Sequence, residues 1–404
     1  MPLEGEEYFL ALDPKPWVSV GLPFAEACAH HASSTFHAKR VYLIVSSSIS
    51  KSPAFTTLNN ALRGSLAGVR YGIRQHVPWP DVLEVASDLR DLDADLIVTL
   101  GAGSLTDGAK VASLAVANGA FTLDALDKIH IRSADPSIQK PCAIPTINIP
   151  TSLSGGEYNP PGGATDLRNS CKTLFRHPSM GAQLVVLDPA LTVSTPERVW
   201  LSSGMRAVDH CVEGLCSVAF RDRGKIAEEK TVELDKIEDH LFDGLKKKEM
   251  LGVIEAMRGL TTGVPMGASH GIGHQLGPLG VGHGETSCVM LPSVLRWNFK
   301  NQGIGEKWVE ERQAKVRDAF WEDAIGAKAL EARGLSRKEA TAGDMVAAFV
   351  AELGMPGSLK DVGVGRDKLE GLAKNSMMDR CIPTNPVAIT EKGELLKILE
   401  MALE

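Results

Sequence analysis

Three histidines in one short stretch are the residues of this sequence best suited to chemistry. His270, His274 and His283 lie among the glycines of the segment 267–283. On a helix, the four-residue spacing of the first two places both imidazoles on one face, and a Gly/Pro-rich turn leads to the third. Imidazole is a common neutral ligand of transition metals and carries protons near neutral pH. We expect a site here; the alternative is three histidines satisfied within a core helix contact.

A second polar group lies on a helix expected at 203–217. Arg206, His210 and Glu213 are four and three residues apart, so one helix face carries all three. This face combines a permanent cation, a titratable imidazole and a carboxylate. The alternative for Arg206 is a local ion pair with Asp209, which contributes less than about 1 kcal/mol if it is exposed.

Two glycine-rich loops are suited to holding phosphate. The loop 101–110 follows an apolar strand and opens a helix, where glycines admit the ligand and the free amides of the helix attract an anion. Asp107 is expected in the first turn, as a cap or a ribose contact. The loop 150–158 is rich in hydroxyls and glycine and can hold phosphate or ribose hydroxyls. Either loop can also be a plain turn.

The elements that would position these loops alternate between strand and helix. Continuous apolar runs predict buried parallel strands, and helical spacing predicts helices between them. The strands are expected at 41–45, 95–100, 142–149 and 183–188, and the helices at 53–66 and 80–92. This alternation predicts a doubly wound parallel sheet in an α/β domain over residues 1–194.

Amphipathic helices dominate the second half, which we interpret as an all-helical domain over residues 195–404. Helices are expected at 306–328, 336–354, 366–375 and 391–403. The segment 221–248 mixes both charge signs with few apolar residues, which favours a solvated helix or an excursion of the chain.

Composition excludes several classes of function. The 404 residues carry a net charge of −7, which gives no basis for nucleic-acid binding, and no apolar run is long enough to span a membrane. Seven cysteines without a Cys-x-x-Cys pair indicate reduced thiols. We therefore expect a cytoplasmic enzyme.

Taken together, the motifs resemble the iron-containing alcohol dehydrogenase superfamily, and within it the maleylacetate reductase branch. The amino-acid sequence of the loop 154–158 is similar to that of fungal members. The matching segments are 101–110, 150–157, 188–192, 204–213, 267–283 and 291–298. The resemblance implies a dehydroquinate synthase-like architecture, hydride transfer between NAD(P)H and a carbonyl, and a homodimer.

The resemblance fails at one metal ligand. Metal-dependent members hold the ion with one Asp and three His, and the corresponding positions here are Arg206, His210, His270 and His283. A guanidinium about 4 Å from a dication, at an effective dielectric of about 20, repels it by about 8 kcal/mol. We therefore expect no metal. The alternative is Fe or Zn held by the three histidines and water.

We interpret Arg206 as an electrostatic substitute for the ion, polarising a substrate carbonyl or clamping a carboxylate. His274 or His270 would then donate the proton. The expected catalytic set is Arg206, His210, His270, His274 and His283. The expected substrate is a small oxo or enoyl acid, or a related metabolite carbonyl.

The expected cofactor contacts come from the loops and from a lysine that the family places near the nucleotide. They are Ser47, Gly101, Ala102, Gly103, Ser104, Asp107, Thr151, Ser152, Ser154 and Lys172. NAD-selective members carry an acidic residue after the second strand, where this chain has Ser46, Ser47 and Ser48. We therefore expect NADPH to be tolerated or preferred.

Three other functions remain open at this point. One is a non-redox acid/base enzyme, such as a dehydratase or isomerase, on the same scaffold. Another is a metal-dependent alcohol dehydrogenase that uses three histidines. The third is a binding or regulatory protein that has lost turnover.

Overall fold

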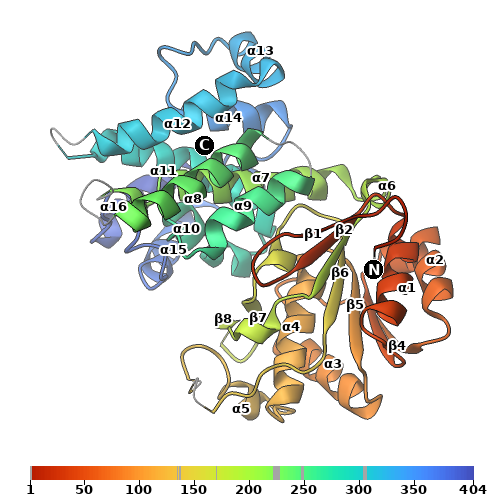
Figure 1. Cartoon of the computed structure of the whole chain (residues 1–404). Helices are drawn as coiled ribbons and strands as arrows, with labels where there is room; N and C mark the ends of the chain where they lie inside the picture. Colours follow the sequence, from red (N-terminus) through yellow and green to blue (C-terminus); the bar gives the residue numbers. More distant parts are fainter. Residues whose placement is uncertain are drawn as a thin grey trace. The chain divides into compact units, whose positions relative to one another are not determined.

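The chain divides into two compact units, Met1–Thr195 and Pro196–Glu404 (Figure 1). The computed structural model describes residues 2–133, 135, 138–169, 171–221, 228–246, 250–303 and 307–404. Within these residues, no helix is long and apolar enough to cross a membrane.

The first unit is built on a seven-stranded sheet in the order β1-β2-β9-β6-β5-β3-β4. Its strands are β1 (Glu7–Leu10), β2 (Trp17–Val20), β3 (Val41–Val45), β4 (Leu66–Tyr71), β5 (Leu96–Gly101), β6 (Thr146–Pro150) and β9 (Leu184–Leu187). All neighbours are parallel except β1 and β2. A separate antiparallel hairpin joins β7 (Gly162–Asp166) and β8 (Cys171–Phe175). The expected doubly wound sheet is confirmed, with the β1–β2 hairpin as an addition.

Helices cover both faces of this sheet, as Figure 1 shows. They are α1 (Phe24–Ser34), α2 (Pro53–Leu62), α3 (Trp79–Asp91), α4 (Gly103–Ala117), α5 (Leu123–Leu126) and α6 (Pro189–Thr192). Alternate residues of β3 serve the two faces: Leu43 packs in the core that includes α1 and α2, and Ile44 packs in the core that includes α3 and α4. A central strand buried on both faces is continuously apolar for this reason.

One strand prediction was wrong in its extent. The run at 142–149 forms strand only from Thr146. Pro145 immediately precedes β6 and has no N–H to donate to a neighbouring strand, which explains the late start.

The second unit is helical. It consists of α7 (Glu197–Leu215), α8 (Glu228–Lys246), α9 (Met250–Thr261), α10 (Ala268–Leu276), α11 (His283–Asn301), α12 (Trp308–Glu322), α13 (Ala324–Ala332), α14 (Ala342–Glu352), α15 (Leu369–Ser376) and α16 (Lys392–Met401). Helix α11 contributes to two cores: Met290 packs with α10, α15 and α16, and Leu291 packs with α7, α8 and α14. It therefore fixes α7 and α10, which carry the candidate site.

The expectation of a solvated 221–248 segment needs correction. Ile237 and Leu241 of α8 are buried in the core shared with α7 and α14. Two apolar residues four apart are enough to dock one face of a charged helix. Residues 222–227 and 247–249 lie outside the described part of the chain.

Gly101 ends β5 with φ of 151°, and a Cβ there would lie 2.7 Å from Leu105 Cδ1. We expect Gly101→Ala to lower the free energy of unfolding by about 1–3 kcal/mol, because it adds both backbone strain and a clash. Chemical denaturation followed by circular dichroism measures the loss. Gly64→Ala is the control, since a Cβ there meets nothing within 4 Å; equal losses in the two variants would contradict the argument.

Candidate functional site

The carboxyl ends of three neighbouring strands bring the expected cofactor residues to one edge of the sheet. In the sheet, β5 lies between β3 and β6. Strand β4 is added on one side of β3 and β5 on the other, so the order of strand addition reverses between β3 and β5. Ligands of doubly wound sheets bind outside the strand ends at such a point. Ser47 follows β3, Gly101 closes β5, and Thr151 follows β6, with its N–H donating to the Gly101 carbonyl at 3.1 Å.

The two glycine-rich loops approach each other closely at this edge. A Cβ on Gly103 would lie 3.1 Å from Ser154 Oγ, and Ser152 and Ser154 share a 2.8 Å hydroxyl hydrogen bond. Helix α4 starts there with Ala102 as its N-cap and no side-chain capping bond. Its first amides, including that of Ser104, are thus available to an anion. The residues present fit a dinucleotide phosphate.

Asp107 and Lys172 meet at Gly163 rather than at the start of α4. Asp107 Oδ2 accepts from Gly163 N at 3.2 Å, so this carboxylate is not the helix cap that the sequence predicted. A Cβ on Gly163 would lie 3.2 Å from Lys172 Nζ, which places the ammonium against the same backbone. Both side chains belong to the wall formed by α4 and the β7–β8 hairpin.

Lys110 is a positioning residue that the sequence analysis did not single out. Its ammonium is buried and donates to the carbonyls of Gly156 at 2.5 Å and Pro161 at 3.1 Å, which fastens the 150–161 loop to α4. Burial lowers the pKa of Lys110 and raises the pKa of the neighbouring Glu157 to about 7.

In the helical unit, Arg206 lies inside a buried polar cluster on α7. Its NH1 donates to Asp209 Oδ2 at 3.4 Å and to Ser287 Oγ at 3.1 Å, whereas its Nε is buried without a partner. Arg206 is 3% exposed and Asp209 is fully buried. The ion pair expected as an exposed alternative therefore exists in a desolvated environment, where losing one partner is costly.

Glu213 connects α7 to the histidine-bearing helix α10. Its carboxylate accepts from the backbone N–H groups of Gly267 at 2.9 Å, Ser269 at 2.8 Å and His270 at 3.4 Å, and from His270 Nδ1 at 2.7 Å. A Cβ on Gly267 would lie 2.8 Å from Glu213 Oε1, so only glycine leaves room for this contact. Glu213 caps α10 from a different helix, a role that α10's own sequence does not reveal.

The contact with Glu213 also fixes the state of His270. Both oxygens of Glu213 accept backbone N–H groups, so His270 Nδ1 is the donor in their contact, and Nε2 is left as a buried acceptor without a partner. Burial and the Arg206 charge lower the pKa of His270 to about 3, and burial lowers that of His210 well below its usual value. A lowered pKa leaves His270 neutral near pH 7, which favours His274 over His270 as the proton donor.

His274 has a different environment. Its Nδ1 lies 3.0 Å from Asp379 Oδ2, and about a quarter of its side chain, 27%, is exposed. Burial raises the pKa of Asp379, but the hydrogen bond and charge of His274 outweigh it and leave the pKa lowered. The cluster extends from Arg206 through His270 to His274, whose ring centroid lies 6.4 Å from that of His270. The sequence analysis missed Asp379, because it is 105 residues distant from its partner.

The three family histidines do not come together. His210 and His270 stack with ring centroids 5.0 Å apart, but His283, the first residue of α11, is exposed. Among the described residues, two groups have possible metal-ligand atoms within 4.8 Å of one another: Asp209, Glu213 and His270, and His274, Asp379 and Cys381. Neither contains His210 or His283.

The donor atoms present do not fit the family's ion. In the first group, Glu213 is occupied by four N–H donors, and Asp209 faces the guanidinium of Arg206. In the second, His274 and Asp379 are bonded to each other, and burial raises the pKa of the Cys381 thiol to about 12. The arrangement instead provides a fixed cation, a neutral imidazole acceptor and a half-buried His–Asp pair.

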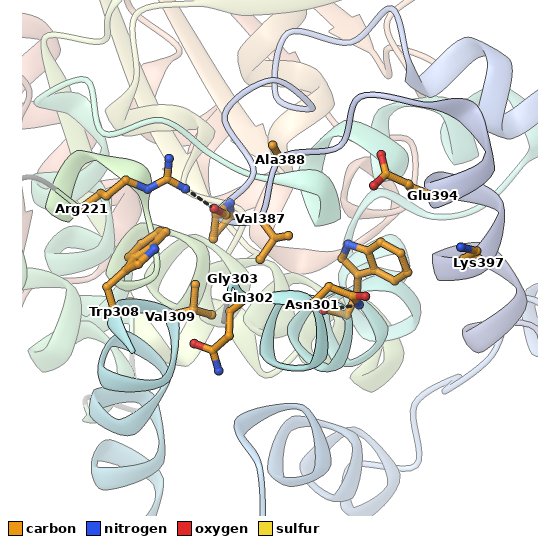
Figure 2. Close-up of a pocket in the computed structure, with 12 residues that line it drawn as sticks. Arg221, Asn301, Gln302, Gly303, Trp308, Val309, Val387, Ala388, Glu394 and Lys397 are labelled. Carbon is orange, nitrogen blue, oxygen red and sulfur yellow. Dashed lines mark hydrogen bonds between the residues drawn. The ribbon is translucent and has the colours of Figure 1, made fainter. Parts of the chain in front are cut away.

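A pocket of about 490 Å³ lies elsewhere in the helical unit (Figure 2). Figure 2 shows Arg221 beside Trp308, where the guanidinium carbon is 4.7 Å from the ring centroid. Arg221 also donates to the Pro386 carbonyl at 2.6 Å. The lining contains none of the expected catalytic residues, so this pocket is separate from the cluster.

We expect Glu213→Ala to lower the free energy of unfolding by about 3–5 kcal/mol, because it strands three N–H groups at the start of α10. Glu213→Gln, which keeps one carbonyl acceptor, should lose about half as much. Urea denaturation measures both, with Glu197→Ala at the exposed start of α7 as control. A loss below about 1 kcal/mol in the alanine variant would show that the capping contact contributes little.

Comparison with known proteins identifies the family. Residues 23–189 match the family described as "Iron-containing alcohol dehydrogenase", and residues 200–403 match "Fe-containing alcohol dehydrogenase family, C-terminal". The chain is 42% identical to dehydrogenase ALT3 of Alternaria alternata, covering 91% of this chain and 100% of that protein. It is 40% identical to dehydrogenase FUM7 of Gibberella moniliformis, covering 96% of each.

Maleylacetate reductase of Rhizobium sp. is more distant in sequence. It is 27% identical over 84% of this chain and 82% of its own length. The crystal structure of that enzyme shares the fold with a TM-score of 0.67, at 22% identity, over 99% of each chain. Two matching family segments that together span most of the sequence, and two relatives near 40% identity, lead to one conclusion: the chain belongs to the iron-containing alcohol dehydrogenase family and is an oxidoreductase of that type.

Proposed function

We propose that the protein is an NAD(P)H-dependent reductase of a small carbonyl compound, similar to maleylacetate reductase, that works without a metal ion. The observation that carries this proposal is the buried Arg206 at the position that corresponds to the family's ligand aspartate, with its Nε unpartnered. A small oxo or enoyl acid, or a related metabolite carbonyl, is the proposed substrate. The homodimer and the cytoplasmic location stay predictions.

In this mechanism, bound NAD(P)H supplies the hydride. Arg206 donates a hydrogen bond from Nε to the carbonyl oxygen and stabilises the negative charge that develops there. His274, held by Asp379, delivers the proton that converts the alkoxide to the alcohol. His270 and His210 remain neutral and line the cluster, with His270 oriented by Glu213.

The strand-edge loops of the first unit support nicotinamide binding. The open start of α4 would take the pyrophosphate, next to Ser154 and Thr151. Ser47 stands where NAD-selective members carry a carboxylate, so nothing in the Ser46–Ser48 segment repels a 2′-phosphate. NADPH is therefore the proposed cofactor of choice, with NADH as the second.

We expect Arg206→Ala to lower kcat/KM for carbonyl reduction about 10²–10³-fold, the usual cost of losing one oxyanion donor. Reduced-nicotinamide absorbance is followed in chelator-treated enzyme, with and without added Fe²⁺ or Zn²⁺. The control is Arg198→Ala on the same helix, where the arginine is exposed and pairs with Glu285. Full activity in Arg206→Ala, or loss of wild-type activity on chelation, would refute metal-free catalysis by Arg206.

We expect Ser47→Asp to raise the KM for NADPH about tenfold or more and to leave the KM for NADH nearly unchanged, because the new carboxylate repels a 2′-phosphate. Steady-state kinetics with both cofactors test this. Asn60→Asp adds the same charge at an exposed position of α2 and should not change the ratio. Strict NADH preference in the wild type would contradict the cofactor assignment.

A further inference from the structure

The charge of Arg206 is already matched before any substrate binds. Asp209 Oδ2 receives three donors: Arg206 NH1 at 3.4 Å, Ser269 Oγ at 3.1 Å and Ser287 Oγ at 2.6 Å. Burial raises the pKa of Asp209, and three donors converging on one oxygen, among them the Arg206 guanidinium, oppose that rise and stabilise the ionised carboxylate. Asp209 Oδ1, by contrast, is buried without a partner. The guanidinium and this carboxylate thus form a pair without net charge. Each has one atom without a hydrogen-bond partner, Nε of Arg206 and Oδ1 of Asp209.

The surroundings add a second carboxylate, and the proton-bearing His274 of the cluster is bonded to a carboxylate of its own, Asp379. Glu213, the other buried carboxylate on α7, is held by three backbone N–H groups and His270, and it also acts on Arg206 electrostatically. His270 adds no charge, because its Nδ1–H donates to Glu213 and its buried Nε2 has no acceptor for a second proton. A substrate carboxylate placed at Arg206 Nε would therefore meet one cation and two anions in a medium of low dielectric, which is unfavourable.

We propose that Asp209 is a specificity-determining residue, which cancels the charge of Arg206 so that the guanidinium accepts a neutral carbonyl oxygen and rejects a carboxylate. This inference rests on the proposed function and narrows it: the group at Arg206 is an aldehyde, ketone or enone oxygen. Any carboxylate on the substrate must bind elsewhere. Arg206 therefore polarises the carbonyl, and the alternative carboxylate clamp is disfavoured.

The pair acetamide and acetate tests this directly, because the two are nearly isosteric and differ by one charge. Each is measured as an inhibitor of carbonyl reduction, and by tryptophan fluorescence titration, which needs no turnover. In the wild type, acetamide should bind more tightly than acetate. If acetate binds more tightly, the proposal is overturned, and this result requires no variant to fold.

Asp209→Asn keeps the shape of the side chain and removes its charge. We expect the affinity ratio of acetate to acetamide to rise about tenfold or more, because Arg206 then has one fewer opposing charge. The kcat/KM for pyruvate, which carries a carboxylate, should rise in parallel relative to that for uncharged methylglyoxal. An unchanged ratio in a variant that unfolds with the wild-type cooperative transition would refute the role of Asp209.

Glu285→Gln is the matched control, since it removes the same charge from a carboxylate that pairs with exposed Arg198. In this variant, the affinity ratio of acetate to acetamide should stay within about twofold of the wild-type ratio. The two proposals fail separately. If no carbonyl compound is reduced but Asp209→Asn still shifts the acetate ratio in fluorescence titration, the reductase function is wrong and the charge selection stands.

Discussion

A guanidinium buried in the helical unit is the constraint on which the site depends. Arginine cannot shed its proton to escape an apolar environment, so the chain must provide compensating charge at a fixed place. Asp209, one turn along α7, provides it, and the hydroxyls of Ser269 and Ser287 hold that carboxylate from α10 and α11. The charge at residue 206 thereby ties three helices together. A buried pair of this kind adds little net stability but is destabilising when broken, which favours one arrangement of these helices.

Glu213 extends the same principle to the backbone. An α-helix leaves its first amides unpaired, and α10 begins at a glycine N-cap that offers no side-chain acceptor. The carboxylate of Glu213 fills this place and in the same contact selects the tautomer of His270. Glu213 therefore has two roles: it caps the start of α10, and it determines that His270 Nε2 is an acceptor. The proposed mechanism therefore assigns proton donation to His274, whose partner Asp379 lies in the segment after α15.

Much of the fold could be predicted from the sequence, because local patterns record it. The continuous apolar runs at β3 and β5 and the glycine-rich start of α4 each report a buried strand or a tight turn directly. The helical spacing of Arg206, His210 and Glu213 correctly indicated a shared face. That spacing could not show what the face meets, and so it left out Ser287, which is 81 residues from Arg206. Asp379, the partner of His274, was missed for the same reason, being 105 residues from it. Closeness in sequence was also misleading for His283. After the turn that follows α10, this residue lies at the exposed start of α11.

In the proposed mechanism, the departure at residue 206 would change the means of stabilising an oxyanion as well as the ligand set. A dication acts by net charge, over a distance and with little dependence on direction. The Arg206–Asp209 pair has almost no net charge, so in that mechanism it would act through the direction of an N–H bond held in a dry environment. Directional stabilisation requires the donor to be fixed before the reaction, and the bonds of NH1 to Asp209 and Ser287 fix it while leaving Nε unused. The buried carboxylate that weakens the cation is thus also what orients it.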